Sequence, residues 1–279
     1  MIELPEAIAF SKQINDTLNG KIVKSAIRGQ TPHRFAFTGK FSDDDFAQIV
    51  RGKTIKKSWA NGNVILVQLD PGYLLSLGCG GERILYHKQE KTIPKKHQLF
   101  VEFEDQTYLT VTVSGWGEVR FLEIKDLDKH PHIPFERMDP LSEEFTFPTF
   151  EELIDLLPGK KKCSAKKFYI TEPGLRGIGN GVIQDIFFLS EIHPKREMKS
   201  LTKEEQKVLY ETTRIELQKM VDLGGRDSEK DLFNKLGRYK RILHSKTANT
   251  PCPVCETLIQ KQQYLGGAIY FCPSCQKLS

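Results

Sequence analysis

The stretch that decides the fold lies near the C-terminus, where Cys252-Pro-Val-Cys255 is followed, after sixteen residues (256–271), by Cys272-Pro-Ser-Cys275. A C-x-x-C pair can hold a metal ion from a tight turn, and two such pairs complete a tetrahedral site of four thiolates. The sequence between them predicts a hairpin, with strands at 257–259 and 268–271 and a Gly266-Gly267 turn. This spacing is typical of a zinc ribbon. We expect a structural Zn²⁺ ion, because four protein ligands leave no open position for catalysis.

Two disulfides in a secreted protein are the alternative interpretation of these four cysteines. No stretch at the start of the chain has the pattern of a signal peptide, so we expect a reduced, cytoplasmic and nucleoid-associated protein. Hydrophobic residues make up 39% of the chain, and no apolar run reaches the length of about 18 residues that a membrane helix needs. We therefore expect no membrane partner.

Charge is distributed unevenly along the 279 residues. Residues 1–157 carry 19 Lys and Arg against 23 Asp and Glu, a net charge of −4, whereas residues 158–279 carry 22 against 13, a net charge of +9. The basic half contains the four cysteines, which favours a polyanion as the partner of that half. Ordinary solvated lysines are the alternative explanation.

The first part of the chain predicts a β-sandwich or barrel. A helix is expected at 5–18, because apolar residues recur among polar ones after Pro5, and a short capped helix is expected at 42–50. Segments rich in Val, Ile and Phe, separated by Gly, Asp or Pro, predict short strands. These segments are 21–28, 34–38, 54–59, 64–69, 73–77, 83–86, 98–103, 108–113 and 118–124.

Four prolines between 128 and 148 indicate a boundary, after which the pattern changes to helical. Helices are expected at 149–157, 181–189, 202–224 and 229–237, and a strand at 167–171. We therefore predict an α+β multidomain protein. Its parts are an N-terminal domain (1–130), a linker (131–148), a helical domain (149–246) and the ribbon (247–279).

Several motifs occur in a particular order along the chain. Met1-Ile-Glu-Leu-Pro-Glu6 opens it, Pro140-Leu-Ser142 opens the second domain, and Gly177-Ile-Gly-Asn180 precedes Ile192-His-Pro194. Gly224-Gly225 follows a long helix, and the ribbon ends the chain. Taken alone, the glycine turn before a helix indicates either a phosphate contact or an ordinary turn. Together, the ordered set resembles the formamidopyrimidine-DNA glycosylase / endonuclease VIII family over essentially the whole chain.

The resemblance implies an N-terminal β-sandwich flanked by helices, a helix–two-turn–helix DNA-binding module and a zinc ribbon. It also implies a monomer that holds damaged double-stranded DNA in the cleft between domains. Members of this family remove damaged bases from DNA in base-excision repair, after flipping the nucleotide out of the duplex. In the family, the α-amine exposed by removal of the initiator methionine forms a Schiff base with the sugar and allows strand cleavage.

The resemblance assigns roles to individual residues. Glu3 matches the catalytic glutamate and Glu6 the second acid of the family. Lys166 and Asn180, the latter preceded by Gly179, match residues that bind phosphates of DNA. The four cysteines, Cys252, Cys255, Cys272 and Cys275, match the zinc ligands.

Three positions depart from the family pattern. The nucleophile position holds Ile2, and we expect Met1 to stay in place, because its removal generally requires a small second residue. The lysine of an early hairpin aligns with Asn63, whose amide cannot replace an ammonium charge. The arginine of the ribbon hairpin aligns with Gly267, which removes a bidentate phosphate donor.

Residues that would touch the bases have also changed. Cys79 stands where the family places a methionine wedge. Trp116 stands in the loop that carries arginines in the family, and it is either a residue that stacks into an unstacked base step or a core or hairpin-packing tryptophan. Arg226 is the candidate in 222–230 for contact with a phosphate or base edge, the alternative being a solvated loop arginine.

Two functions from different classes are therefore predicted. The first is a DNA glycosylase/AP lyase with altered lyase chemistry, in which Glu3 and an activated water replace the amine. The second is a catalytically inactive, zinc-containing binder of damaged or structured nucleic acid. A zinc-ribbon adaptor between proteins is a third hypothesis, which explains the cysteines but not the ordered motifs.

Overall fold

The computed structural model describes residues 1–29, 31, 33–34, 36–37, 41–78, 80–133, 136–159 and 162–278. The chain forms two compact units. The first comprises Met1–Pro134 and Val221–Tyr239, and the second comprises Phe135–Met220 and Lys240–Ser279. Cys79 and parts of the strand expected at 34–38 lie outside the described residues. The four-part domain division stays a prediction. Val221–Tyr239, which falls in the predicted helical domain, belongs to the first unit.

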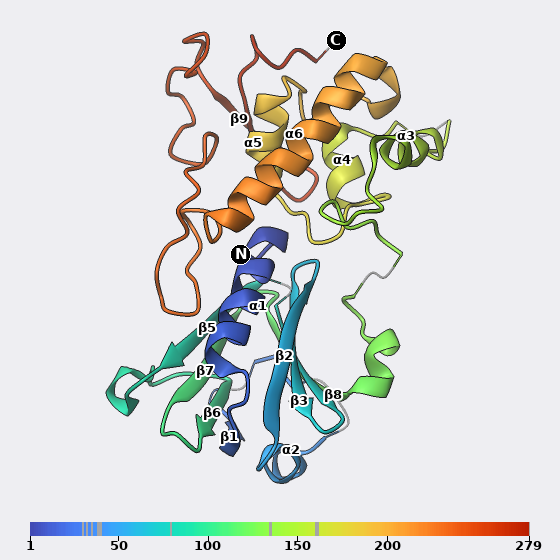
Figure 1. Cartoon of the computed structure of the whole chain (residues 1–279). Coiled ribbons are helices and arrows are strands. Elements are labelled where there is room, and N and C mark those ends of the chain that lie inside the picture. Colours follow the sequence, from blue (N-terminus) through green and yellow to red (C-terminus); the bar gives the residue numbers. More distant parts are fainter. Residues whose placement is uncertain are drawn as a thin grey trace. The chain divides into compact units, whose positions relative to one another are not determined.

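The first unit contains two antiparallel four-stranded sheets, drawn in Figure 1. One has the order β1 (Val23–Arg28), β6 (Leu99–Phe103), β7 (Tyr108–Ser114) and β5 (Gly81–His87). The other has the order β2 (Thr54–Asn61), β3 (Val64–Asp70), β4 (Tyr73–Gly78) and β8 (Glu118–Glu123). Their inward side chains belong to one apolar core, which confirms the predicted β-sandwich within an α+β fold.

Helix α1 (Leu4–Leu18) covers the sandwich core from the side of β2 and β3. Phe10, Ile14 and Leu18 recur every four residues and are buried, so one face of the helix packs against the sheet. The chain leaves α1 at Gly20, whose φ of +82° suits a glycine. The predicted helix at 5–18 is therefore confirmed.

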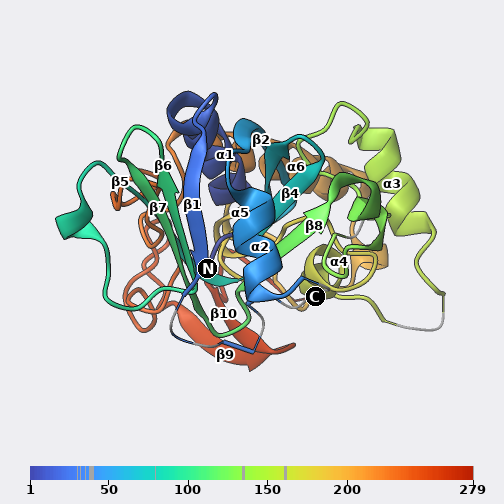
Figure 2. The same ribbon diagram turned by 90° about the horizontal axis from the view of Figure 1, so that it is seen from below.

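Helix α2 (Asp43–Val50) packs near β1 at one end of the sandwich, as Figures 1 and 2 show. Ser42 caps it, since its Oγ accepts a hydrogen bond from the Asp45 N–H at 3.1 Å. Phe46 enters the core and makes an edge-to-face contact with Phe121 of β8 at 5.0 Å. Two short 3₁₀ helices, η1 (Glu90–Thr92) and η2 (Ile124–Lys129), also belong to the first unit.

The Arg226 segment, Val221–Tyr239, begins at the end of helix α6 (Lys203–Asp222) and belongs to the first unit. The sequence predicted a helix at 229–237, and this prediction is wrong. Local backbone hydrogen bonds form turns instead, from the Asp231 N–H to the Lys235 carbonyl at 2.8 Å and from the Gly237 N–H to the Glu229 carbonyl at 3.0 Å. Leu232 is fully buried in the sandwich core, so tertiary packing determines this conformation.

The second unit is mainly helical. Its helices are α3 (Phe147–Asp155), α4 (Ala165–Ile170), α5 (Ile183–Leu189), η3 (Met198–Ser200) and α6 (Lys203–Asp222). The strand expected at 167–171 is wrong, because Ser164 caps a helix there and accepts a hydrogen bond from the Lys167 N–H. A hairpin of β9 (Gln260–Tyr264) and β10 (Gly267–Phe271) lies between the cysteine pairs. Among the described residues, no helix is long and apolar enough to span a membrane.

Candidate functional site

The start of α1 carries the two predicted acids. Glu3 precedes the helix and Glu6 lies in its first turn, where the Glu6 Oε2 accepts a hydrogen bond from the Glu3 N–H at 3.0 Å. Both residues are almost fully buried, at 4% and 3% exposure. Two carboxylates in such surroundings require a cation or hydrogen-bond donors nearby.

Arg226 supplies that cation. Its Nε and Nη2 donate to the two oxygens of Glu6 at 2.9 and 2.7 Å, and its backbone N–H donates to the Glu6 Oε1 at 3.0 Å. Its Nη1 lies 3.4 Å from the Glu3 Oε1. Arg226 is only 2% exposed, so the interpretation as a solvated loop arginine is wrong. A contact between this side chain and DNA stays a prediction.

The backbone beside Arg226 comes close to Glu6. Gly225 has a φ of +97°, and a Cβ at this position would lie 3.1 Å from the Glu6 Cγ. A side chain would therefore be strained and crowded there. This explains why a glycine precedes the arginine that reaches both acids.

Ion pairing offsets the unfavourable burial of Glu6 and Arg226. Burial alone raises the pKa of Glu6, but the charge of Arg226 and its hydrogen bonds more than offset burial and lower this pKa from its ordinary value. Burial likewise opposes the charged guanidinium, whereas Glu3 and Glu6 raise the pKa of Arg226. Glu6 and Arg226 are therefore both charged near neutral pH, and removing either would leave the other poorly compensated.

The N-terminus lies beside this cluster. The Met1 α-ammonium donates to the Glu229 Oε2 at 2.5 Å, and the Met1 carbonyl accepts a hydrogen bond from the Arg226 Nη2 at 2.9 Å. The Ile2 N–H donates to the Gly80 carbonyl at 3.1 Å, and Ile2 is 3% exposed. The nitrogen of residue 2 is thus a hydrogen-bonded amide at the edge of the core.

Another carboxyl group, that of Glu82, lies near enough to the N-terminal ammonium for the two charges to interact. It accepts hydrogen bonds from the backbone N–H groups of Gly80 at 3.2 Å and Glu118 at 2.5 Å. Burial nevertheless raises the pKa of Glu82 to about 7. Sequence reasoning missed both Glu82 and Glu229, because neither belongs to a motif and their positions depend on long-range packing.

Two more predicted positions lie in the first unit. Asn63 sits in the turn between β2 and β3, and its carbonyl packs against Gly78, where a Cβ would lie 2.3 Å away. Lys56 and Lys57, in β2, are exposed. Trp116 lies between β7 and β8 and is 73% exposed, so the core interpretation of this tryptophan is wrong. Stacking on DNA bases stays a prediction for it.

The predicted phosphate contacts lie in the second unit, against the β9–β10 hairpin. Lys166 is fully buried, and its Nζ donates to the carbonyls of Tyr264 and Gly267, the latter at 3.3 Å. Burial lowers the pKa of Lys166 to about 8. Asn180 lies against Gly267, where a Cβ would lie 2.8 Å from the Asn180 Nδ2. The missing ribbon side chain thus leaves room for Asn180.

Gly179 and its neighbours form the turn before α5. Gly177 has a φ of +71°, in the left-handed region that favours glycine. The Asn180 carbonyl accepts a hydrogen bond from the Gln184 Nε2 at 2.8 Å, and the same amide donates to the Ala268 carbonyl at 3.2 Å. The turn is therefore tied to strand β10 of the hairpin.

The four cysteines come together as predicted. Their Sγ atoms all lie within 4.8 Å of one another. The Sγ atoms of Cys252 and Cys275 lie 3.9 Å apart, and those of Cys255 and Cys272 lie 3.4 Å apart. Four sulfurs at the Zn–S bond length of about 2.3 Å in a tetrahedron would be about 3.8 Å apart. The donor set and its spacing therefore fit a zinc ion.

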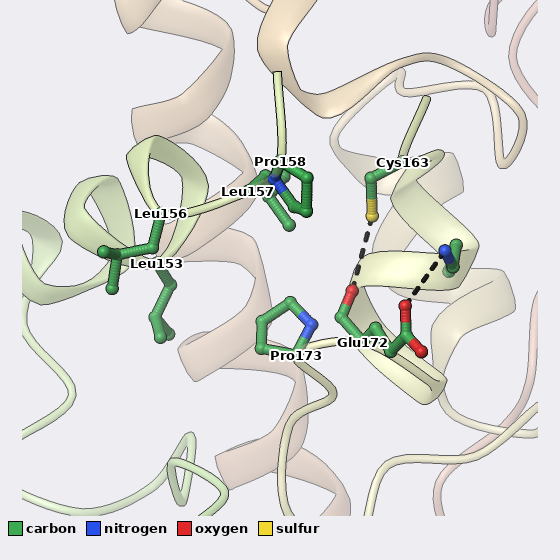
Figure 3. A pocket seen from close by; sticks show the side chains of 8 residues that line it. Leu153, Leu156, Leu157, Pro158, Cys163, Glu172 and Pro173 are labelled. Atoms are coloured by element: carbon green, nitrogen blue, oxygen red, sulfur yellow. Dashed lines mark hydrogen bonds and ion pairs between the residues drawn. The ribbon is translucent and has the colours of Figure 1, made fainter. Parts of the chain in front are cut away.

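An apolar pocket of about 270 Å³ lies elsewhere in the second unit (Figure 3). The Cys163 thiol donates to the Glu172 carbonyl at 3.4 Å, and the Lys167 Nζ pairs with the Glu172 Oε2 at 3.1 Å. Burial raises the pKa of the Cys163 thiol, so it is a poor nucleophile. None of the predicted site residues lines this pocket.

The fold and the site together define a class of protein. Its members have a β-sandwich covered by a helix with paired acids at its start, and a helical unit that carries a four-cysteine hairpin. Comparisons agree with it. Residues 1–114 match the model of the formamidopyrimidine-DNA glycosylase N-terminal domain. The formamidopyrimidine-DNA glycosylases of Listeria innocua and Cytobacillus firmus are each 28% identical, over 291 and 288 residues, and each match covers 99% of this chain and all of the relative. These comparisons support the formamidopyrimidine-DNA glycosylase / endonuclease VIII family for this chain.

Solved structures show the same fold. The Lactococcus lactis Fpg in complex with an abasic-site DNA matches with a TM-score of 0.82 and 21% identity over 99% of both chains. The complex of the same protein with a Fapy-dG DNA matches with a TM-score of 0.83 and 21% identity, over 99% of this chain and all of the other. At this identity the likeness shows the fold alone.

Proposed function

We propose that this protein is a DNA glycosylase of base-excision repair that releases damaged bases from duplex DNA. The buried cluster of Glu3, Glu6 and Arg226 at the start of α1 is the observation that carries the proposal. The relatives' names support a damaged purine as the base, and the solved neighbours are complexes with Fapy-dG and abasic DNA. The protein acts as a monomer in this proposal.

Glu3 is the acid–base residue of the proposed reaction. The nitrogen of residue 2 is an amide that donates to the Gly80 carbonyl, so it has no basic lone pair with which to attack the sugar. A water molecule then attacks the anomeric carbon and gives a proton to Glu3, while the bond from this carbon to the damaged base breaks and the base leaves with the electron pair and the proton from Glu3. Arg226 positions Glu3 and Glu6.

DNA contacts are proposed from both units. Trp116 is exposed and offers an aromatic face to an unstacked base step. Lys166, Gly179 and Asn180 are the proposed phosphate contacts of the second unit. Because the Lys166 ammonium is held by two hairpin carbonyls, it would have to exchange these partners for a phosphate.

Base release tests the proposal directly. A labelled duplex with one formamidopyrimidine is incubated with the protein, and hot alkali then cleaves every abasic site, so strand cleavage by the protein is not needed. We expect base release that falls by about 10²–10⁴ in Glu3→Gln, the usual contribution of an acid–base group. Glu90→Gln, an exposed glutamate of η1, is the control and keeps full activity. A duplex that is bound and never loses a base would refute the glycosylase proposal.

A second candidate function is a non-catalytic binder of damaged DNA. The observation that favours it is the hydrogen-bonded amide nitrogen of residue 2, together with Asn63 at the position of the family's hairpin lysine. This function predicts tighter binding of damaged than of intact duplex, weakening with salt, and no base release in the wild-type protein or in Glu3→Gln.

We also propose that the cysteine cluster holds one Zn²⁺ ion, which supplies no chemistry and fixes the β9–β10 hairpin. Elemental analysis of the purified protein should find one zinc per chain, and Cys272→Ser should lose it. Retention of zinc by that variant, or a stoichiometric amount of another metal, would contradict the assignment.

A further inference from the structure

We propose that Glu82 is a positioning residue for the Trp116 turn, which joins β7 to β8 and comprises Ser114–Glu118. Its carboxylate fastens this turn to the backbone of Gly80, so that the tryptophan is held in one place for an unstacked base step. The inference rests on the DNA contact proposed for Trp116. It gives a role to a carboxyl group that the proposed reaction does not use.

The Trp116 turn lies where the chain crosses from one sheet to the other. The pair Gly78–Glu118 ends the ladder of β4 and β8, and the pair Gly81–Ser114 ends the ladder of β5 and β7. Two crossings, from β4 to β5 and from β7 to β8, therefore run between the same two ladder ends. Backbone N–H groups at such a crossing need other acceptors, because the ladder pairing has stopped.

Glu82 supplies two of these acceptors. Its Oε2 accepts a hydrogen bond from the Gly80 N–H at 3.2 Å, and its Oε1 accepts one from the Glu118 N–H at 2.5 Å. The two donors belong to different crossings, so a single carboxylate joins them. Within the turn, the Gly117 N–H donates to the Ser114 carbonyl at 3.0 Å, which closes the turn next to this carboxylate.

Two glycines allow the crossings to approach each other closely. A Cβ on Gly80 would lie 3.3 Å from the Gly117 nitrogen, and a Cβ on Gly117 would lie 2.6 Å from the Glu82 Oε1. A side chain at Gly117 would therefore displace the carboxylate, so its absence is part of the arrangement. Trp116 is 73% exposed, so its ring lies largely outside the core and its place follows from the backbone of the turn.

The same contact reaches the start of α1. The Gly80 carbonyl accepts a hydrogen bond from the Ile2 N–H at 3.1 Å, and Ile2 immediately precedes Glu3. Gly80 thus binds Glu82 through its N–H and the chain before Glu3 through its carbonyl. The turn proposed to stack on DNA and the proposed acid–base residue are therefore connected through one backbone residue.

The charge of Glu82 sets the strength of these hydrogen bonds. Burial raises the pKa of Glu82 to about 7, whereas the hydrogen bonds from the backbone N–H groups and the N-terminal ammonium lower it, because they favour the carboxylate. The Glu118 side chain is paired with Arg120 at 2.8 Å and with His132 at 3.0 Å, and His130 lies 3.5 Å from it. Because charge-assisted hydrogen bonds are the stronger ones, the turn is held more tightly as the pH rises through about 7.

Fluorescence of the full chain without DNA is the first test. Trp59 and Trp116 are the two tryptophans of the sequence, so Trp59→Phe leaves Trp116 as the reporter. We expect its anisotropy to rise with pH, with a midpoint of about 7, as the turn becomes more rigid. Glu82→Gln in the same background removes the charge change and should give a flat profile, while the histidines near Glu118 are present in both proteins. Equal profiles with and without Glu82, or no change in either protein, would overturn the inference.

Binding of a duplex that contains a tetrahydrofuran abasic site, at about pH 8, is the second test. We expect Trp116→Ala to raise the Kd about tenfold and Glu82→Gln to raise it about threefold. The double variant should match Trp116→Ala alone, because Glu82 acts through the tryptophan. Glu90→Gln, at an exposed glutamate, is the control and should bind as the wild type does. A double variant that binds about thirtyfold more weakly, or Glu82→Gln that binds normally, would rule the inference out.

Base release separates this inference from the proposed function. Loss of the base from a formamidopyrimidine duplex, with both Trp116 tests failing, would leave the glycosylase intact and refute only the role of Glu82. Success of both tests without any base release would refute the glycosylase and leave a binder of damaged DNA in which Glu82 positions Trp116.

Discussion

Arg226 is the residue on which the candidate site depends. Its guanidinium is buried between Glu3 and Glu6 and also binds the Met1 carbonyl. Arginine suits this place because its planar fork donates in several directions and stays charged when buried. A lysine would offer one compact ammonium, which cannot reach all three partners with the same geometry.

Replacing Arg226 by methionine should destabilise the protein strongly. The change leaves two carboxylates buried without their cation, which costs about 3–5 kcal/mol in comparable buried pairs. We expect the free energy of unfolding in urea to fall by this amount. Arg51→Ala, at an exposed arginine after α2, serves as the control and should change it by less than about 0.5 kcal/mol. Equal effects of the two substitutions would contradict the role assigned to the cluster.

Glu82 should make stability depend on pH. Its pKa is raised from 4.5 to about 7 by burial, so the folded state binds a proton that the unfolded state has already lost between these values. The stabilisation that Glu82 contributes is therefore fully present below about pH 4.5 and is lost as the pH rises through about 7. The shift corresponds to at most about 3 kcal/mol, and to less because the side chain is only half-buried.

Glu82→Gln tests this dependence, because an amide cannot lose the proton. Urea unfolding at about pH 4.5, 6 and 8 should show a decline for the wild type and a flatter profile for the variant. Parallel profiles for the two proteins would show that Glu82 does not carry the dependence.

At the scale of elements, sequence patterns predicted what local physics determines. The period-two strands of the sandwich and the four-residue recurrence of Phe10, Ile14 and Leu18 are visible in the chain itself. The strand expected at 167–171 failed because the capping hydroxyl of Ser164 makes a helix more favourable than β-propensity suggests. Sequence reasoning also recognised the four cysteines, whose spacing is itself the signal.

The candidate site could be predicted only in part. Glu3 and Glu6 stand in a motif, so their place was foreseen. Their cation comes from Arg226, 220 residues after Glu6, and nothing in the chain links the two positions. The segment around Arg226 has a helix-like pattern, but burial of Leu232 and the hydrogen bond from the Phe233 N–H to the Asp231 Oδ1 override its local preference.

The β9–β10 hairpin offers an element-scale prediction about DNA affinity. Gly267→Arg adds a cation at the tip of β10, and its Cβ displaces only the end of the Asn180 side chain. We expect tighter binding of duplex DNA and a plot of log affinity against log salt that is steeper by about 0.9, as one more phosphate is neutralised. Gly159→Arg adds the same charge where a Cβ meets no atom within 4 Å, and it should leave the slope nearly unchanged. Similar slopes for both variants would indicate general charge rather than a phosphate contact.

At the scale of the molecule, the first unit is built from two separate stretches of chain. The Arg226 segment returns to the sandwich across the intervening second unit of sequence. It contributes more than charge, because the Leu232 N–H donates to the Gln13 Oε1 at 3.0 Å and its carbonyl accepts from the Tyr86 N–H at 2.9 Å. The sandwich and its paired acids therefore form one cooperative structure only when both stretches are present.

A fragment of residues 1–134 should consequently be less stable than the same fragment joined to residues 221–239 by a flexible linker. The shorter fragment lacks Arg226, which leaves Glu3 and Glu6 without their cation, and it exposes the place that Leu232 fills. The first loss costs about 3–5 kcal/mol and the second about 1.5–3 kcal/mol. Melting of the two fragments should show a clear gap, and Arg226→Met in the joined fragment should remove about half of it. Equal melting temperatures of the two fragments would show that the Arg226 segment does not stabilise the first unit. The site would then have to be explained by residues 1–134 alone.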